Sequence, residues 1–204
     1  TIDLPNIWSP IAPPTDETEN QWAPYEFKWI ENLGAKMISR IRITCGNQKL
    51  QEFSGDFLLA QIQRDLTGIK RVLFDKMTGD VPELNDPGNS GARVNSYPNA
   101  FYTSANTGPE PSILGRTLYI PLNAWFCTTS QRAFPLIALQ YNELQIEVTF
   151  RPINQLFSIR DVQDPEYNFP YVAPNFNLEY MQMYRFVQPP PSVDLNQEDY
   201  TDTR

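Results

Sequence analysis

Carboxylate acid–base chemistry is the one kind of catalysis that the residue types of this chain leave open. Its 204 residues include no histidine, so Ser-His-Asp and Cys-His catalysis are excluded within it. Glu143 and Glu147 lie four residues apart in a stretch of alternating apolar residues and would share one face of a strand. Because the pattern indicates no apolar pocket that would raise a pKa, we interpret both as solvated, outward-facing carboxylates.

Metal and thiol chemistry are not favoured either. Without histidine, Cys45 and Cys127 are the only soft ligands, and two thiolates cannot complete a structural zinc site. Both lie in apolar contexts, so we predict two buried free thiols. Free thiols fit folding in a reducing, cytosolic compartment. A disulfide between the two cysteines is the alternative. We therefore expect no catalytic residues, no metal site and no cofactor, and we do not expect an enzyme.

The charge of the chain argues against direct binding to nucleic acid. The formal net charge is −8, whereas phosphate binding needs clustered Lys and Arg. No run of about 18 apolar residues is present to span a bilayer, and the first residues lack the features of a signal peptide. We expect a soluble, unexported chain, and its start at Thr1 and polar end suggest a fragment or a processed product.

Extended segments dominate the expected secondary structure. The 19 prolines disfavour long helices, and the 13% aromatic share favours a packed core. Most of the predicted strands show period-two alternation, as half-buried strands do. The six predicted strands cover residues 25–30, 37–45, 48–53, 117–124, 141–151 and 176–186. This pattern predicts an all-β fold, an antiparallel β-sandwich of the jelly-roll type with short helical insertions and long loops.

Two amphipathic helices are expected after the second hairpin strand. Ser54 is a suitable N-cap, and the first apolar stripe follows it with a spacing of four at Leu58, Ile62 and Leu66. Gly68 interrupts the pattern, and Gly79 ends a second stripe. That second stripe consists of Ile69, Val72, Leu73 and Met77.

Proline-rich segments divide the chain. Residues 1–24 read as an extended N-terminal arm that is pinned by Trp8 and Trp22. Residues 25–188 form the predicted jelly-roll domain, which includes a long loop over residues 80–115. Residues 189–204 form a proline-rich linker towards a further domain. The arm and the loop are the best candidates for contacts with neighbouring subunits.

Two stretches resemble a known family. Residues 117–127 read TLYIPLNAWFC, and residues 133–144 read AFPLIALQYNEL. The order of an IPL…WF strand, a short helix and a PLIALQY turn before an alternating strand is similar to that in the major capsid proteins of nucleocytoplasmic large DNA viruses. Shorter likenesses occur at residues 29–38, where Ala35-Lys36 departs from the usual Gly-Asp, and at residues 53–58 and 177–186.

This resemblance implies a structural protein of the virion. Members of the family are similar in carrying two consecutive jelly rolls, so the second roll is missing from this chain. They form homotrimers. Each homotrimer is a pseudo-hexagonal capsomer, and the capsomers tile an icosahedral capsid. The implied partners are other copies of the same protein, neighbouring capsomers and the second jelly roll of the same polypeptide, with minor capsid proteins possible. The implied location is the virion, after folding and assembly in the host cytoplasm.

Two other functions remain open from the residues. In a carbohydrate-binding or glycan-processing jelly roll, exposed aromatic rings stack on sugars and paired carboxylates do acid–base work. Four tryptophans are available for stacking, namely Trp8, Trp22, Trp29 and Trp125. The other alternative is a minor structural protein of the virion.

Overall fold

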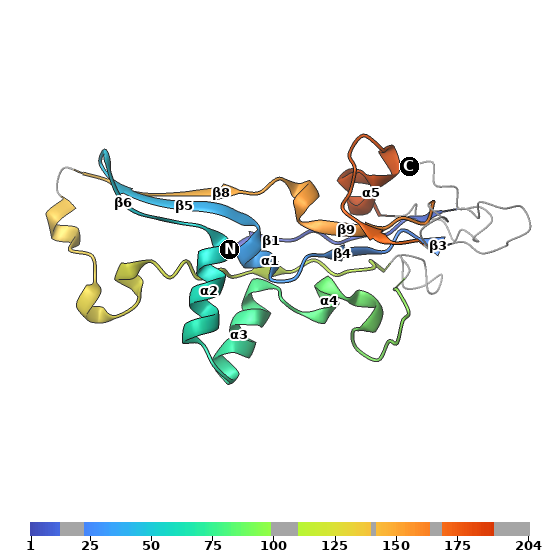
Figure 1. Ribbon diagram of the computed structural model, residues 1–204, viewed down its shortest axis with the longest axis horizontal. Coiled ribbons are helices and arrows are strands. Elements are labelled where there is room, and N and C mark those ends of the chain that lie inside the picture. The colour runs from blue at the N-terminus through green and yellow to red at the C-terminus, as the bar shows by residue number, and fades with distance from the viewer. Residues whose placement is uncertain (13–22, 99–109, 140–141, 164–168, 190–204) are drawn as a thin grey trace, which may run out of the picture. The chain divides into compact units, whose positions relative to one another are not determined.

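The chain forms two structural units. The computed structural model describes residues 1–12, 23–98, 110–139, 142–163 and 169–189. Unit 1 contains Asn32–Asp80 and Leu118–Pro152, and unit 2 contains Ile2–Glu31, Val81–Thr117 and Ile153–Arg204. The sheets and short helices of each unit are shown in Figure 1. Each unit is described by itself below.

A three-stranded antiparallel sheet is the centre of unit 1 (Figure 1). Strand β5 (Ile38–Cys45) lies between β6 (Gln48–Phe53) and β8 (Leu144–Phe150). Gly46, at the tight turn between β5 and β6, has a φ of 57°, which glycine adopts without a steric penalty. The strands predicted in these three places are confirmed.

The two faces of this sheet differ as the period-two pattern predicts. Ile41 and Ile43 are fully buried on one face. Arg40 and Arg42 project from the opposite face, where both form ion pairs with Glu147 of β8. The alternation along β5 thus separates an apolar face from a charged one.

Three helices pack beside the sheet. They are α1 (Leu33–Lys36), α2 (Gly55–Asp65) and α3 (Ile69–Thr78). The Ser54 hydroxyl accepts a hydrogen bond from the Phe57 backbone N–H at 3.2 Å, which confirms the predicted N-cap. Leu58 and Ile62 of α2 pack against Phe74 of α3 in one buried cluster.

The helix predicted to carry the second apolar stripe is confirmed, and the stripe itself is exposed. Its four apolar side chains are exposed, by between 42% and 79%: Ile69, Val72, Leu73 and Met77. The buried residues of α3 are instead Phe74 and Thr78, whose hydroxyl donates to the Phe74 carbonyl at 2.9 Å. Gly34 of α1 approaches Thr78 so closely that an added Cβ would lie 2.6 Å from the Thr78 carbonyl oxygen. Packing against α1 therefore turns the apolar stripe of α3 outward.

The predicted strand at residues 117–124 is also wrong beyond its first residues. Only β7 (Thr117–Leu118) is a strand, and it is followed by irregular chain. Pro121 has no N–H to donate to a ladder, and Asn123 adopts a positive φ of 48°. Three 3₁₀ turns follow: η2 (Trp125–Cys127), η3 (Ser130–Arg132) and η4 (Leu136–Leu139).

The burial predicted for Cys127 is wrong. It is a free thiol, as expected, but it is exposed rather than buried, and Cys45 is half-buried and also free. The apolar run that suggested burial at Trp125 and Cys127 lies in a 3₁₀ turn with no buried residue.

Unit 2 is organised around a second antiparallel sheet and an aromatic core. The sheet has the order β10 (Tyr171–Val172), β9 (Phe157–Arg160) and β4 (Phe27–Trp29). Tyr25, Phe27 and Trp29 alternate along the chain and are all buried. The Phe27 ring stacks on Phe157 with centroids 4.6 Å apart and meets Trp29 edge-on at 5.0 Å.

The predicted last strand at residues 176–186 is wrong. The chain there forms a 3₁₀ turn, η6 (Glu179–Met181), and a short helix, α5 (Met183–Val187). Met181 and Arg185, four residues apart, are buried together with Phe186, so burial does not follow a period of two. The helical arrangement buries the Phe186 ring against Phe27 and Phe157.

Short elements complete unit 2. Strand β1 (Ile2–Asp3) pairs with β7, and β2 (Ile11–Ala12) pairs antiparallel with β3 (Ala23–Pro24). The predicted long loop begins with two helical turns, α4 (Pro82–Asn85) and η1 (Pro87–Asn89), and η5 (Ile153–Gln155) precedes β9. Residues 99–109 of that loop and residues 190–204 of the predicted linker lie outside the described residues. Small antiparallel sheets with short helices are consistent with the predicted β-sandwich class.

Gly55 is required by close packing within unit 1. An added Cβ would lie 2.6 Å from the Ile38 carbonyl oxygen and closer still to that of Ala35. We expect Gly55→Ala to lower the free energy of unfolding by about 1–3 kcal/mol, because the backbone must move to relieve the overlap. Urea denaturation followed by circular dichroism measures this. Gly88→Ala is the control, because its Cβ would meet nothing within 3.8 Å; equal effects of the two substitutions would contradict the packing argument.

Candidate functional site

The predicted carboxylate pair does not form an acid–base site. Glu147 lies on the charged face of the unit 1 sheet, 3.6 Å from the Arg40 guanidinium and 3.7 Å from that of Arg42. Its side chain is 56% exposed. Glu143 is also exposed, and its backbone carbonyl accepts a hydrogen bond from Gly46 N–H. Both carboxylates are outward-facing and exposed, as expected.

The charged face extends across the sheet to β6. The Arg42 Nε donates a hydrogen bond to Glu52 at 3.0 Å, and this bond is the main cause that holds the pKa of Glu52 below its usual value. Lys49 lies 3.6 Å from the same carboxylate oxygen. The face is thus a ladder of exposed ion pairs, each of which contributes little stability alone.

Metal ligands do not gather anywhere in the part of the chain that the structure describes. Within the same residues, no helix has both the length and the apolar character that crossing a bilayer requires.

The tryptophans give little support to sugar stacking. Trp8 and Trp29 are buried in unit 2, and Trp22 lies outside the described residues. Trp125 is 37% exposed and packs edge-on against Phe126 and tilted against Phe134. One partly exposed ring remains available.

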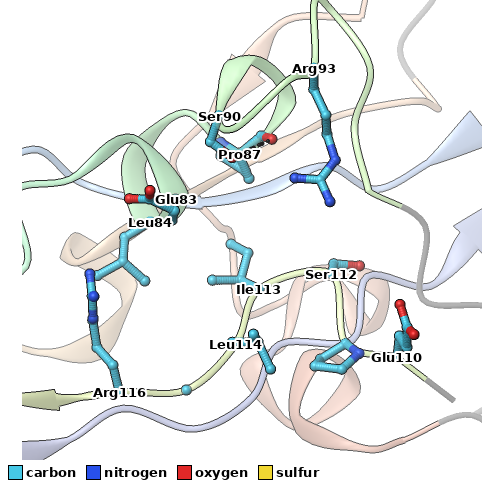
Figure 2. A pocket seen from close by; sticks show the side chains of 12 residues that line it. Glu83, Leu84, Pro87, Ser90, Arg93, Glu110, Ser112, Ile113, Leu114 and Arg116 are labelled. Carbon is cyan, nitrogen blue, oxygen red and sulfur yellow. Dashed lines mark hydrogen bonds between the residues drawn. The ribbon is translucent and has the colours of Figure 1, made fainter.

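A pocket of about 720 Å³ lies in unit 2, lined by the two ends of the predicted 80–115 loop (Figure 2). Its buried apolar lining includes Leu84 and Ile113. Two arginines and two glutamates also line it, so its charged groups balance: Arg93, Arg116, Glu83 and Glu110. This balance favours neither an anionic nor a cationic ligand.

Tyr97 fastens the same loop to the rest of unit 2. Its hydroxyl accepts a hydrogen bond from Phe27 N–H at 3.0 Å and donates to the Phe27 carbonyl at 2.9 Å. The same hydroxyl is 2.7 Å from Ser9 Oγ, in the predicted arm. Burial is the largest cause that raises the pKa of Tyr97. Because β4 is an edge strand, the side chain takes the place of a neighbouring strand at Phe27.

An isolated backbone bridge at Ile7 also holds the arm. Ile7 bridges Ile113 through backbone hydrogen bonds of 2.9 and 3.2 Å, and Trp8 N–H donates to the Phe186 carbonyl at 2.7 Å. The described part of the arm is therefore hydrogen-bonded to unit 2, and Trp8 is one of its fixed points.

Exposed apolar side chains mark the remaining surfaces that could bind a partner. In unit 1 they include the outward stripe of α3 and two residues of β8, Ile146 and Phe150. The sequence identified these residues as apolar and periodic. Periodicity shows which side chains share a face, and it does not show whether the same chain covers that face.

Comparison with known proteins places this chain among viral shell proteins. A family profile described as the N-terminus of major capsid proteins matches residues 11–184. The chain is 31% identical to the major capsid protein of Chrysochromulina ericina virus over 134 residues, which are 63% of this chain and 22% of that protein. It is 33% identical to capsid protein 1 of Acanthamoeba polyphaga mimivirus over 138 residues, which are 67% of this chain and 21% of that protein.

A third relative is the major capsid protein of Phaeocystis pouchetii virus, 29% identical over 131 residues, which are 63% of this chain and 25% of that protein. The matched region thus spans about a quarter or less of each of these three relatives.

Removal of the Tyr97 hydroxyl tests its role as the anchor of the loop. We expect Tyr97→Phe to cost about 1–3 kcal/mol of unfolding free energy, because Phe27 N–H and C=O then lose their partner at a buried site. Hydrogen exchange at the Phe27 amide should accelerate as well. Tyr184→Phe is the matched control, since that hydroxyl bonds Glu179 at an exposed site. An unchanged exchange rate at Phe27 would contradict the anchor.

Proposed function

Because this chain belongs to the family of major capsid protein N-termini of large DNA viruses, we propose that it is a structural subunit of a viral capsid, without catalysis. The observation that carries the proposal is the profile match over residues 11–184, which covers most of the chain. The structure offers a physical reason as well. A shell subunit works through stiff sheets and through surface segments that meet neighbours, and the antiparallel sheets of both units are consistent with this role.

The proposed fold is the first of two jelly rolls. The three-stranded antiparallel sheet that each unit contains supports it, because jelly rolls are built from antiparallel strands. In this proposal residues 25–188 form the roll, residues 1–24 form an arm, and residues 189–204 lead to the second roll. Exposed apolar side chains on α3 and β8 are consistent with surfaces that other parts of the polypeptide or other subunits cover.

The proposed assembly is a homotrimer that acts as a pseudo-hexagonal capsomer. Neighbouring capsomers are its further partners, and minor capsid proteins can join them. The net charge of −8 supports contacts with protein rather than with nucleic acid. The proposed location is the virion, after folding and assembly in the host cytoplasm. Two free cysteines agree with folding in a reducing compartment.

The carbohydrate-binding alternative has lost most of its support. Two of the four tryptophans are buried, and Glu147 is engaged by two arginines. A minor structural protein of the virion is distinguished from the capsomer subunit by its assembly state.

Light scattering after size exclusion tests the proposal on the full-length polypeptide. We expect a particle mass three times the intact mass that denaturing mass spectrometry gives for the same polypeptide. A stable monomer at micromolar concentration would contradict the capsomer proposal and would favour one of the two alternatives.

A further inference from the structure

Two distant parts of the 80–115 loop meet the N-terminal arm at one residue, Ser9. The Ser9 backbone N–H donates a hydrogen bond to Ser112 Oγ at 3.2 Å, and Ser9 Oγ lies 2.7 Å from the Tyr97 hydroxyl. Tyr97 and Ser112 lie on either side of residues 99–109, and all three residues belong to unit 2. A single residue of the arm is therefore hydrogen-bonded to both described ends of the loop.

The hydroxyl groups of these three residues form a sheltered polar cluster. Ser9 is 2% exposed, Ser112 is 7% exposed, and Tyr97 is half-buried. Burial is the largest cause that raises the pKa of Tyr97, and the hydrogen bonds of its hydroxyl with Ser9 and Ser112 lower it. Removing one partner leaves a buried polar group unsatisfied, which costs free energy. Each member of the cluster thus depends on the other two.

The arm also supplies backbone partners to one wall of the pocket, residues 110–116. Leu4 N–H donates to the Arg116 carbonyl at 2.9 Å, and Gly115 N–H donates to Asn6 Oδ1 at 2.8 Å. The same wall lines the pocket of about 720 Å³ (Figure 2), so it borders open space there. The hydrogen bonds of this wall to the arm are therefore a main part of what holds it in place.

We infer that the Ser9, Tyr97 and Ser112 hydroxyls form a clasp that closes the loop on the arm, so that both ends of the loop open together when the arm leaves. The clasp joins residues 88 and 103 positions apart in the sequence. Hydrogen bonds of such long range tie distant segments into one cooperative unit, which opens locally without unfolding the rest of the protein.

The clasp couples the arm and the loop as binding surfaces. A partner that binds the released arm opens the loop, and a partner that binds the closed loop holds the arm in place, because coupling between two sites is reciprocal. This inference goes beyond the proposed function, because the bonds of the clasp lie within one chain and do not require assembly.

Hydrogen exchange of the full-length polypeptide, followed by mass spectrometry of its peptides, tests the clasp. We expect Ser9→Ala to accelerate exchange about fivefold or more at both Ser96 and Ile113, because a buried hydrogen bond is lost. The Ser96 amide donates to the Gly88 carbonyl at 3.0 Å, and the Ile113 amide donates to the Ile7 carbonyl at 3.2 Å. Neither of these bonds involves the Ser9 hydroxyl, so a merely local role of Ser9 would leave both unchanged.

Asn6→Ala is the matched control. It also removes an arm side chain that bonds the pocket wall, at Gly115, but at an exposed position outside the clasp. We expect exchange at Ser96 to stay unchanged in this variant. The Ile30 amide, which donates to the Leu156 carbonyl at 3.1 Å, reports whether the whole of unit 2 opens.

Each result decides the inference. Faster exchange at both ends of the loop in Ser9→Ala, with Ile30 unchanged, supports the clasp, and Ser112→Ala should repeat this result from the other side. Faster exchange at one end only, or at neither end, overturns it. Equal acceleration at Ile30 also overturns it, because unit 2 then opens as a whole. An equal effect of Asn6→Ala at Ser96 overturns the special role of the three hydroxyls.

Discussion

The alternation of side chains along β5 is the constraint on which the rest of unit 1 depends. This strand lies between β6 and β8, so its faces become the faces of the whole sheet. Ile41 and Ile43 require one face to be covered, and Arg40 and Arg42 require the other to meet carboxylates or water. A slip of one residue in either ladder would exchange these faces, so the register of β6 and β8 is fixed by β5.

Unit 2 is held by different means. Its sheet is short, and its core is a cluster of aromatic rings from β4, β9 and α5 around Phe27. At the edge of β4, the hydroxyl of Tyr97 forms hydrogen bonds with both the backbone N–H and the backbone carbonyl of Phe27. A loop that is hydrogen-bonded to the core in this way can present a defined surface to a neighbour, as a structural subunit requires.

Local patterns predicted the parts of the fold that depend on local rules. The hairpin at Gly46 and the N-cap at Ser54 follow from turn and capping chemistry, and the strand at residues 144–150 follows from its alternation. The strand predicted at residues 117–124 is interrupted because Pro121 lacks an N–H and Asn123 adopts a positive φ. The strand predicted at residues 176–186 is replaced in part by a short helix, which buries a different set of side chains from a strand.

Other features could not be read from apolar patterns. The outward position of the α3 stripe accompanies a contact distant in sequence, the close approach of Gly34 to Thr78. The exposure of Cys127 accompanies a 3₁₀ turn that contains no buried residue. Likewise, the position of the Tyr97 hydroxyl beside Phe27 could not be read from the sequence and required the structure. The resemblance noted in the sequence rested on residues 117–127 and 133–144, whose described parts are mostly irregular chain and 3₁₀ turns.

The most direct test of the central claim, that this chain is a building block of the capsid, is quantitative mass spectrometry of purified virions. The account predicts peptides from this chain at a molar amount among the highest of all virion proteins, retained after the genome and loosely bound proteins are removed. Peptides that are absent from virions, or present at a few copies per particle, would contradict it.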